Sequence, residues 1–119
     1  MSLLYPITVL MIPATLILLG LIMWHHPPRI NNLYGYRTRR SMSSPTMWRE
    51  AQPFAGRMLV LAGLTGLAFA ILVFLLMGRG AAAILVAVSI QTMALIGIIP
   101  LTERHLSRKG LESRDKGKD

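Results

Sequence analysis

The chain has 119 residues, the size of one domain at most. Hydrophobic residues make up 53% of it and charged residues 15%, below the roughly 25% usual in soluble domains, and mean hydropathy is +0.51. This composition excludes an ordinary water-soluble globule. The formal net charge is +8. Cysteine is absent, and its absence excludes disulfides, thiolate metal sites and cysteine nucleophiles.

Three stretches, residues 1–24, 58–77 and 81–102, contain no charged side chain. Each is about 20 residues long, the length at which a helix spans the roughly 30 Å hydrocarbon core of a bilayer. None shows the polar stripe that a helix of a soluble bundle turns toward water. We therefore predict an all-α integral membrane protein with three transmembrane helices, at residues 4–24, 54–77 and 81–101.

The first predicted helix ends at Trp24, whose amphipathic ring suits the membrane interface, and two prolines follow it. Inside the helix, Pro13 removes one hydrogen bond, and we expect the hydroxyl of Thr8 or Thr15 to partner the freed carbonyl. No basic residue precedes the helix and no small-residue cleavage site follows it. The sequence therefore predicts a retained anchor rather than a cleaved signal peptide.

The segment 25–53 differs from a flexible linker because it is rich in arginine, aromatic and turn-forming residues. We expect it to fold back against the helix ends at the membrane surface. Ser44 suits a helix N-cap and Pro45 a first helical position, so the sequence predicts a short interfacial helix over residues 45–52. Pro53 is expected to separate this helix from the second transmembrane helix or to kink the chain between the two.

In the second transmembrane helix, Ala62, Gly66 and Ala70 recur every four residues. Such a stripe of small residues lets another helix approach closely, and we expect it to serve packing and self-association into a homo-oligomer. In the third helix, Gln91 lies near the middle of the membrane and needs a polar partner. We interpret it as an interhelical hydrogen-bonding residue, with a place on a transport path as the alternative.

The basic residues indicate the orientation of the chain. The segment 25–57 carries six arginines and one acid, the tail from Glu103 six basic residues and four acids, and the short second connection only Arg79. By the positive-inside rule the long loop and the C-terminus are cytoplasmic and the N-terminus is outside. Attraction to anionic headgroups then explains the surplus of positive charge, and no nucleic-acid partner is expected. We predict one membrane domain, residues 1–103, and a basic, flexible tail, residues 104–119, whose start can continue the third helix as far as Lys109.

The sequence offers few residues for catalysis. His25 and His26 are adjacent and point in different directions, and zinc needs three or four ligands, so no metal and no cofactor is expected. No spacing suggests a catalytic Ser-His-acid set, and we predict that the protein is not an enzyme. The arginines of the loop can hold a phosphate, which keeps a lipid- or phosphate-binding enzyme or transporter as an alternative.

The run Asn-Asn-Leu-Tyr-Gly-Tyr-Arg-Thr-Arg-Arg-Ser-Met, residues 31–42, with Trp48 and Ala51 after it, resembles the signature of the SdpI/YfhL immunity family. The resemblance covers roughly residues 5–103. Where that family has an asparagine soon after the Trp-x-x-Ala, this chain has Gln52. The resemblance implies a multi-pass protein of the bacterial plasma membrane that gives immunity to, or senses, a membrane-active peptide toxin without catalysis.

Two other functions stay open beside immunity: the lipid- or phosphate-binding enzyme or transporter, and a structural subunit of a larger membrane complex. Within the loop we expect Arg37 to be the central ionic group and Gly35 to supply the turn. Bracing of the loop onto the bundle is the alternative to ligand contact. The predicted ligand-binding or loop-organising residues are Asn32, Tyr34, Gly35, Tyr36, Arg37, Thr38 and Trp48.

Overall fold

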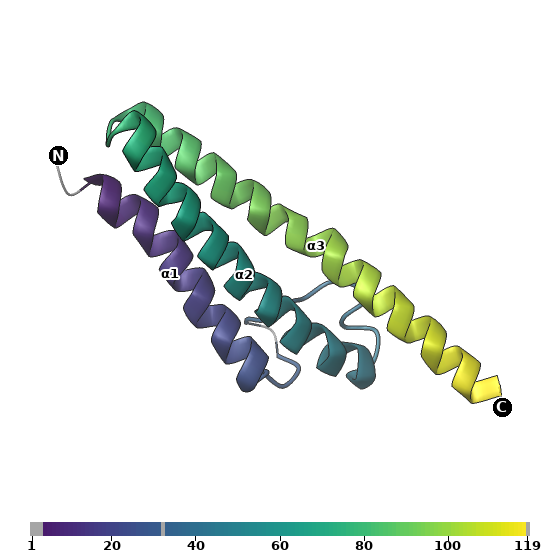
Figure 1. Cartoon of the computed structure of the whole chain (residues 1–119). Helices are drawn as coiled ribbons and strands as arrows, with labels where there is room; N and C mark the ends of the chain where they lie inside the picture. Colours follow the sequence, from purple (N-terminus) through teal and green to yellow (C-terminus); the bar gives the residue numbers. More distant parts are fainter. Residues whose placement is uncertain (1–3, 32, 119) are drawn as a thin grey trace.

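The structure is a computed structural model that describes residues 4–31 and 33–118, and in this part it consists of three helices and one long loop (Figure 1). Each helix contains an apolar segment long enough to cross a membrane. The predicted class, an all-α membrane protein with three spanning helices, is therefore confirmed. The helices are α1 (Leu4–His25), α2 (Pro45–Met77) and α3 (Ala81–Lys118).

Helix α2 packs against both α1 and α3, which contact each other far less. It approaches α1 closely at two glycines: a Cβ on Gly56 would lie 2.7 Å from the carbonyl oxygen of Gly20, and one on Gly63 would lie 2.8 Å from that of Pro13. Gly78, with φ of 80°, ends α2 by donating its N–H to the carbonyl of Phe74. Small residues therefore set the distance between the first two helices.

Helix α2 begins as predicted, because the Ser44 hydroxyl accepts the N–H of Met47 and Pro45 follows it. The predicted break at Pro53 is wrong, since α2 runs without interruption to Met77. Pro53 removes only the hydrogen bond to the carbonyl four residues before it, and buried neighbours on both sides hold the helix in place. Residues 45–52 are thus the first turns of α2 and not a separate helix.

Helix α3 continues past the predicted end at residue 101 and through Pro100, as far as Lys118. Its extension packs on the first turns of α2, where the rings of His105 and Phe54 stack with centroids 4.1 Å apart. His105 also lies 3.6 Å from the Glu50 carboxylate. These contacts beyond the apolar segment explain why the helix does not end at the membrane boundary. The segment 104–118, predicted as a flexible tail, is helical here.

The stripe of Ala62, Gly66 and Ala70 is buried inside the bundle. Ala70 packs in a cluster with Tyr5 of α1 and with alanines of α3, and a Cβ on Gly66 would lie 2.9 Å from the Cγ of Gln91. The stripe therefore serves helix packing within one chain. The chain's own helices cover it, and self-association through it stays a prediction.

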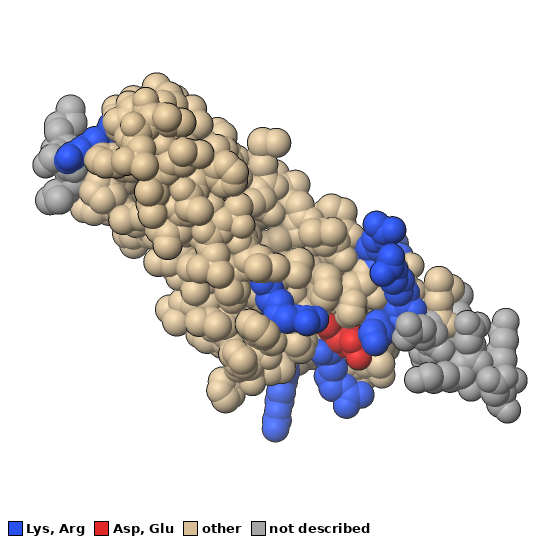
Figure 2. Space-filling view, viewed as in Figure 1, with Lys and Arg blue, Asp and Glu red and all other residues tan. Residues whose placement is uncertain are grey.

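The outer surfaces of the helices are apolar. Large hydrophobic side chains such as Leu18, Leu75 and Met93 are at least 60% exposed. In the space-filling view, the charged side chains gather toward the ends of the molecule and leave an uncharged region between them (Figure 2). Water does not accommodate an exposed apolar surface of this extent, whereas a bilayer does.

Candidate functional site

The loop of residues 26–44 is held against the helix ends by Gln52, which is completely buried. Its Oε1 accepts the N–H of Tyr36 at 2.7 Å, and its Nε2 donates to the carbonyl of the same residue at 2.9 Å. One side chain of α2 thus satisfies both backbone groups of Tyr36. This pair of bonds fixes the path of the loop at its centre.

A second attachment comes from Trp48, also buried, whose Nε1 donates to the carbonyl of Pro28 at 2.7 Å. Gly35 lies between the two attachments with φ of 113°, in the region that favours glycine. A Cβ there would also come within 2.8 Å of Gln52 Oε1. Position 35 therefore requires glycine for two reasons, the positive φ angle of its backbone and the close approach of Gln52.

Local hydrogen bonds stiffen the rest of the loop. Ser41 is fully buried; its Oγ accepts the N–H of Thr38 at 2.8 Å and lies 3.0 Å from the carbonyl of Tyr36, to which it can donate. In return, Thr38 Oγ1 accepts the N–H of Ser41 at 3.2 Å. Asn31 Oδ1 accepts the N–H groups of Leu33 and Tyr34, which makes an Asx turn. The loop is thus an ordered element, as expected.

The side chain of Tyr36 joins the loop to α3. Its hydroxyl donates to Glu103 Oε1 at 2.8 Å, and Arg40 Nε lies 3.1 Å from Glu103 Oε2. Burial raises the pKa of the Tyr36 phenol above its ordinary value, and the hydrogen bond to Glu103 and the charge of that carboxylate raise it further. The phenol therefore stays protonated near neutral pH and acts as a hydrogen-bond donor.

The outer surface of the loop combines cations with apolar side chains. Arg37 and Arg39 are exposed, and Leu33 is 91% exposed. Arg37 has contacts within the chain. Two hydrogen bonds join the backbone of Tyr36 to Gln52. An open depression of about 470 Å³ lies beside the loop. Its lining residues are Thr38, Arg39, Arg40, Ser43, Ile99 and Glu103.

The structure divides the predicted site residues into two groups. Gly35, Tyr36, Thr38 and Trp48 lie in or against the hydrogen-bonded interior of the loop. The side chains of Tyr34 and Arg37 are on its exposed side. Asn32 lies outside the described residues. The sequence did not identify Ser41 and Gln52 as organising residues, although Gln52 stands where the family that the chain resembles has an asparagine.

Gln91 makes the predicted interhelical contact in the middle of the bundle. Its Nε2 donates to the carbonyl of Val9 at 3.2 Å, and this carbonyl is the one that Pro13 leaves without an intrahelical donor. The Thr15 hydroxyl bonds the carbonyl of Met11 instead, so the expected role of a threonine there is corrected. Gln91 Oε1 is buried without a partner among the described residues.

The described residues contain no group of three or more His, Asp or Glu side chains that could hold a metal ion. What the loop offers chemically is recognition: guanidinium groups that bind anions, beside exposed apolar side chains. The backbone that carries them is immobilised from α2 and α3. Such an arrangement can bind a partner with little loss of conformational freedom.

Comparison with known proteins relates the chain to one family. Residues 28–102 match the model of the SdpI/YfhL protein family. Over 50 residues the chain is 44% identical to the uncharacterized protein YfhL of Bacillus subtilis (strain 168), a match that covers 41% of this chain and 46% of that protein. The matched stretch therefore spans about half the length of this relative. No solved structure matches the chain. Because the family model covers more than half of it, the chain belongs to the SdpI/YfhL family.

Proposed function

We propose that this protein protects a bacterial cell from a membrane-active peptide, or senses such a peptide, without catalysis. The observation that carries the proposal is the rigid attachment of the loop 26–44 to the helix ends by Gln52 and Trp48. The loop contains the residues that resemble the family's signature, and its exposed side chains include Arg37, Arg39 and Leu33. A surface that combines cations with apolar side chains suits an amphipathic peptide at the membrane surface.

The proposal includes an orientation. We place the loop and the end of α3 in the cytoplasm and the α2–α3 turn outside, in the plasma membrane. The support is the distribution of basic residues, six in the segment 25–57 against one in the turn. In this orientation the loop meets a peptide that has reached the inner surface of the bilayer.

Two exposed residues of the loop test the proposal. Cells that express the protein, the Leu33→Asp variant or the Arg37→Ala variant are exposed to a panel of membrane-active peptides, and growth is recorded. We expect the native protein to raise the inhibitory concentration of at least one peptide and both variants to reduce this protection. Thr46→Ala, an exposed change on α2 outside the loop, is the control. The proposal is contradicted if both loop variants protect cells as well as the native protein does, or if the native protein protects against no peptide.

The depression beside Arg39 and Arg40 favours a second candidate, binding of a phosphate group. Glu103 already balances the charge of Arg40, which leaves Arg39 as the cation that can attract an anion there. Titration of the purified protein with inorganic phosphate distinguishes the candidates. Saturable binding that Arg39→Gln abolishes, without any protection of cells, favours the second.

A further inference from the structure

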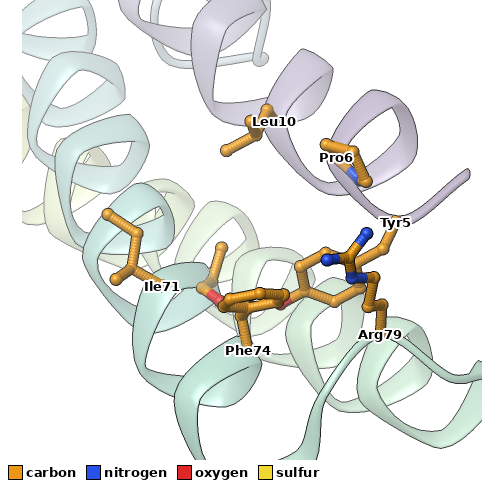
Figure 3. Close-up of a pocket in the computed structure, with 7 residues that line it drawn as sticks. Tyr5, Pro6, Leu10, Ile71, Phe74 and Arg79 are labelled. Atoms are coloured by element: carbon orange, nitrogen blue, oxygen red, sulfur yellow. The ribbon is translucent and has the colours of Figure 1, made fainter. Parts of the chain in front are cut away.

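A separate apolar recess lies at the end of the bundle away from the loop 26–44 (Figure 3). It lies between the first turns of α1 and the last turns of α2 and has a volume of about 310 Å³, within the range of small-molecule sites. Among the described residues that line it, Arg79 alone carries a charge. The other lining residues are Tyr5, Pro6, Leu10, Ala70, Ile71 and Phe74.

The recess is lined by apolar groups rather than by free hydrogen-bonding groups. The one hydroxyl on its lining, that of Tyr5, donates to the carbonyl of Ala70 at 2.6 Å and is thereby satisfied. The ring of Tyr5 lies 6.0 Å from that of Phe74. Water gains little in such a space, since it needs two or more polar partners, whereas a hydrocarbon chain loses no hydrogen bond on entering.

The guanidinium group of Arg79 lies over the ring of Phe74, 5.5 Å from its centroid (Figure 3). Its neighbours Gly78 and Gly80 have open space where a side chain would begin, so an incoming group can approach Arg79 closely. Arg79 also has contacts within the chain. A guanidinium has five N–H donors, and it can add a bidentate anion to such contacts.

The charge at this end is positive and far from the carboxylate side chains that the structure describes. The sequence contains no acidic residue between Glu50 and Glu103, and both of these lie at the loop end of the bundle. Glu50 and Arg79 are separated by nearly the whole length of α2, roughly 40 Å at 1.5 Å per residue. Arg79 is therefore complementary to an anion at the place where apolar surface ends and headgroups begin.

We infer that the recess is a binding site for an anionic phospholipid of the bilayer, with one acyl chain between α1 and α2 and the phosphate group at Arg79. The exposed side chains of Leu10 and Ile71 border the recess, so a chain can enter sideways from the membrane. The site is independent of the loop and of the function proposed for it. It requires only the apolar lining and the cation.

Native mass spectrometry of the detergent-solubilised protein tests the inference. The protein is incubated with equal amounts of phosphatidylglycerol and phosphatidylcholine of the same acyl chains, and the retained lipid is identified. We expect one bound lipid and a preference for phosphatidylglycerol of about fivefold, the effect of one basic residue at a membrane surface. Arg79→Gln should abolish the preference. Arg57→Gln should preserve it, although Arg57 lies over the ring of Phe54 in the same way.

A second pair of variants tests the recess itself. Ile71→Trp fills it from an exposed position, and Leu72→Trp adds the same ring at the adjacent exposed position that does not line it. We expect the first variant to lose the bound lipid and the second to keep it. The inference is overturned if both tryptophan variants behave alike or if Arg57→Gln and Arg79→Gln lose the preference equally. It is also overturned if sodium oleate, added in competition, is retained in place of phospholipid, because the occupant is then a free fatty acid.

Discussion

The side chain of Gln52 bonds both the N–H and the carbonyl of Tyr36, because its amide carries an acceptor oxygen and a donor nitrogen. The sequence shows that Arg37 is charged, but it does not show that Gln52 is buried, so Arg37 was the expected central group. Gln52 stands on a helix face that becomes buried only when the loop folds over it. The turn at Gly35 was predictable from the residue type, but the group that organises the loop depended on tertiary structure.

Replacement of Gln52 by leucine should destabilise the protein. The change leaves the N–H of Tyr36 without its acceptor and removes one of two donors to the Tyr36 carbonyl, which keeps the Ser41 hydroxyl. An unsatisfied buried group costs about 1–3 kcal/mol. We expect a lower melting temperature in detergent and faster proteolysis of the loop. Thr46→Val, an exposed change on the first turns of α2, is the control. If the two variants melt alike, the bonds from Gln52 do not stabilise the loop.

The phenol of Tyr36 should make stability depend on pH in the alkaline range. Its pKa in the folded protein is raised by burial and by Glu103, so folding favours the protonated form. The contribution is fully present below about pH 10, where the unfolded phenol also keeps its proton, and is lost as pH rises toward the folded pKa. Unfolding of the native protein and of Tyr36→Phe, compared from pH 7 to 11, should show a stability difference that shrinks above about pH 10. A constant difference contradicts this assignment.

At the scale of the helices, hydropathy predicted how many segments span the membrane but not where every helix ends. The uncharged stretches correspond to α1 and to the apolar parts of α2 and α3. Pro53 and Pro100 are both inside helices, because contacts on each side outweigh one missing hydrogen bond. The extension of α3 depends on packing such as that of His105 on Phe54, and this packing cannot be recognised from the local sequence pattern. Element type therefore followed from composition, and element length followed from tertiary contacts.

Gln91 and Pro13 should be energetically coupled across helices. In the native chain, Gln91 Nε2 supplies the hydrogen bond to Val9 that the ring of Pro13 denies it. In the Pro13→Ala variant a backbone N–H again reaches the Val9 carbonyl. Gln91→Leu should therefore lower the free energy of unfolding of the native protein by about 1 kcal/mol more than it lowers that of the Pro13→Ala variant. A double-mutant cycle on unfolding in bicelles measures this coupling. Additive effects of the two changes would show that the bond from Gln91 does not compensate for the proline.

At the scale of the whole molecule, two ends of different character flank an apolar middle. The 22 residues of α1 span about 33 Å, which matches the hydrocarbon core of a bilayer. The loop end carries most of the described charges, and Arg79 lies in the α2–α3 turn at the opposite end. Figure 2 shows basic side chains toward both ends of the molecule. This asymmetry supports the proposed orientation, because basic residues of short loops are retained on the cytoplasmic side.

The absence of cysteine from the chain makes the orientation directly testable. Arg39→Cys and Arg79→Cys place single thiols at exposed positions on the two ends. We expect a membrane-impermeant maleimide to label the Arg79→Cys variant in intact bacterial cells and the Arg39→Cys variant only after permeabilisation. Each variant removes one basic residue, so the native excess of basic residues on the loop still orients the chain. The reverse labelling would put the loop outside, where a peptide is met before it enters the membrane, and would move the recess near Arg79 to the inner leaflet.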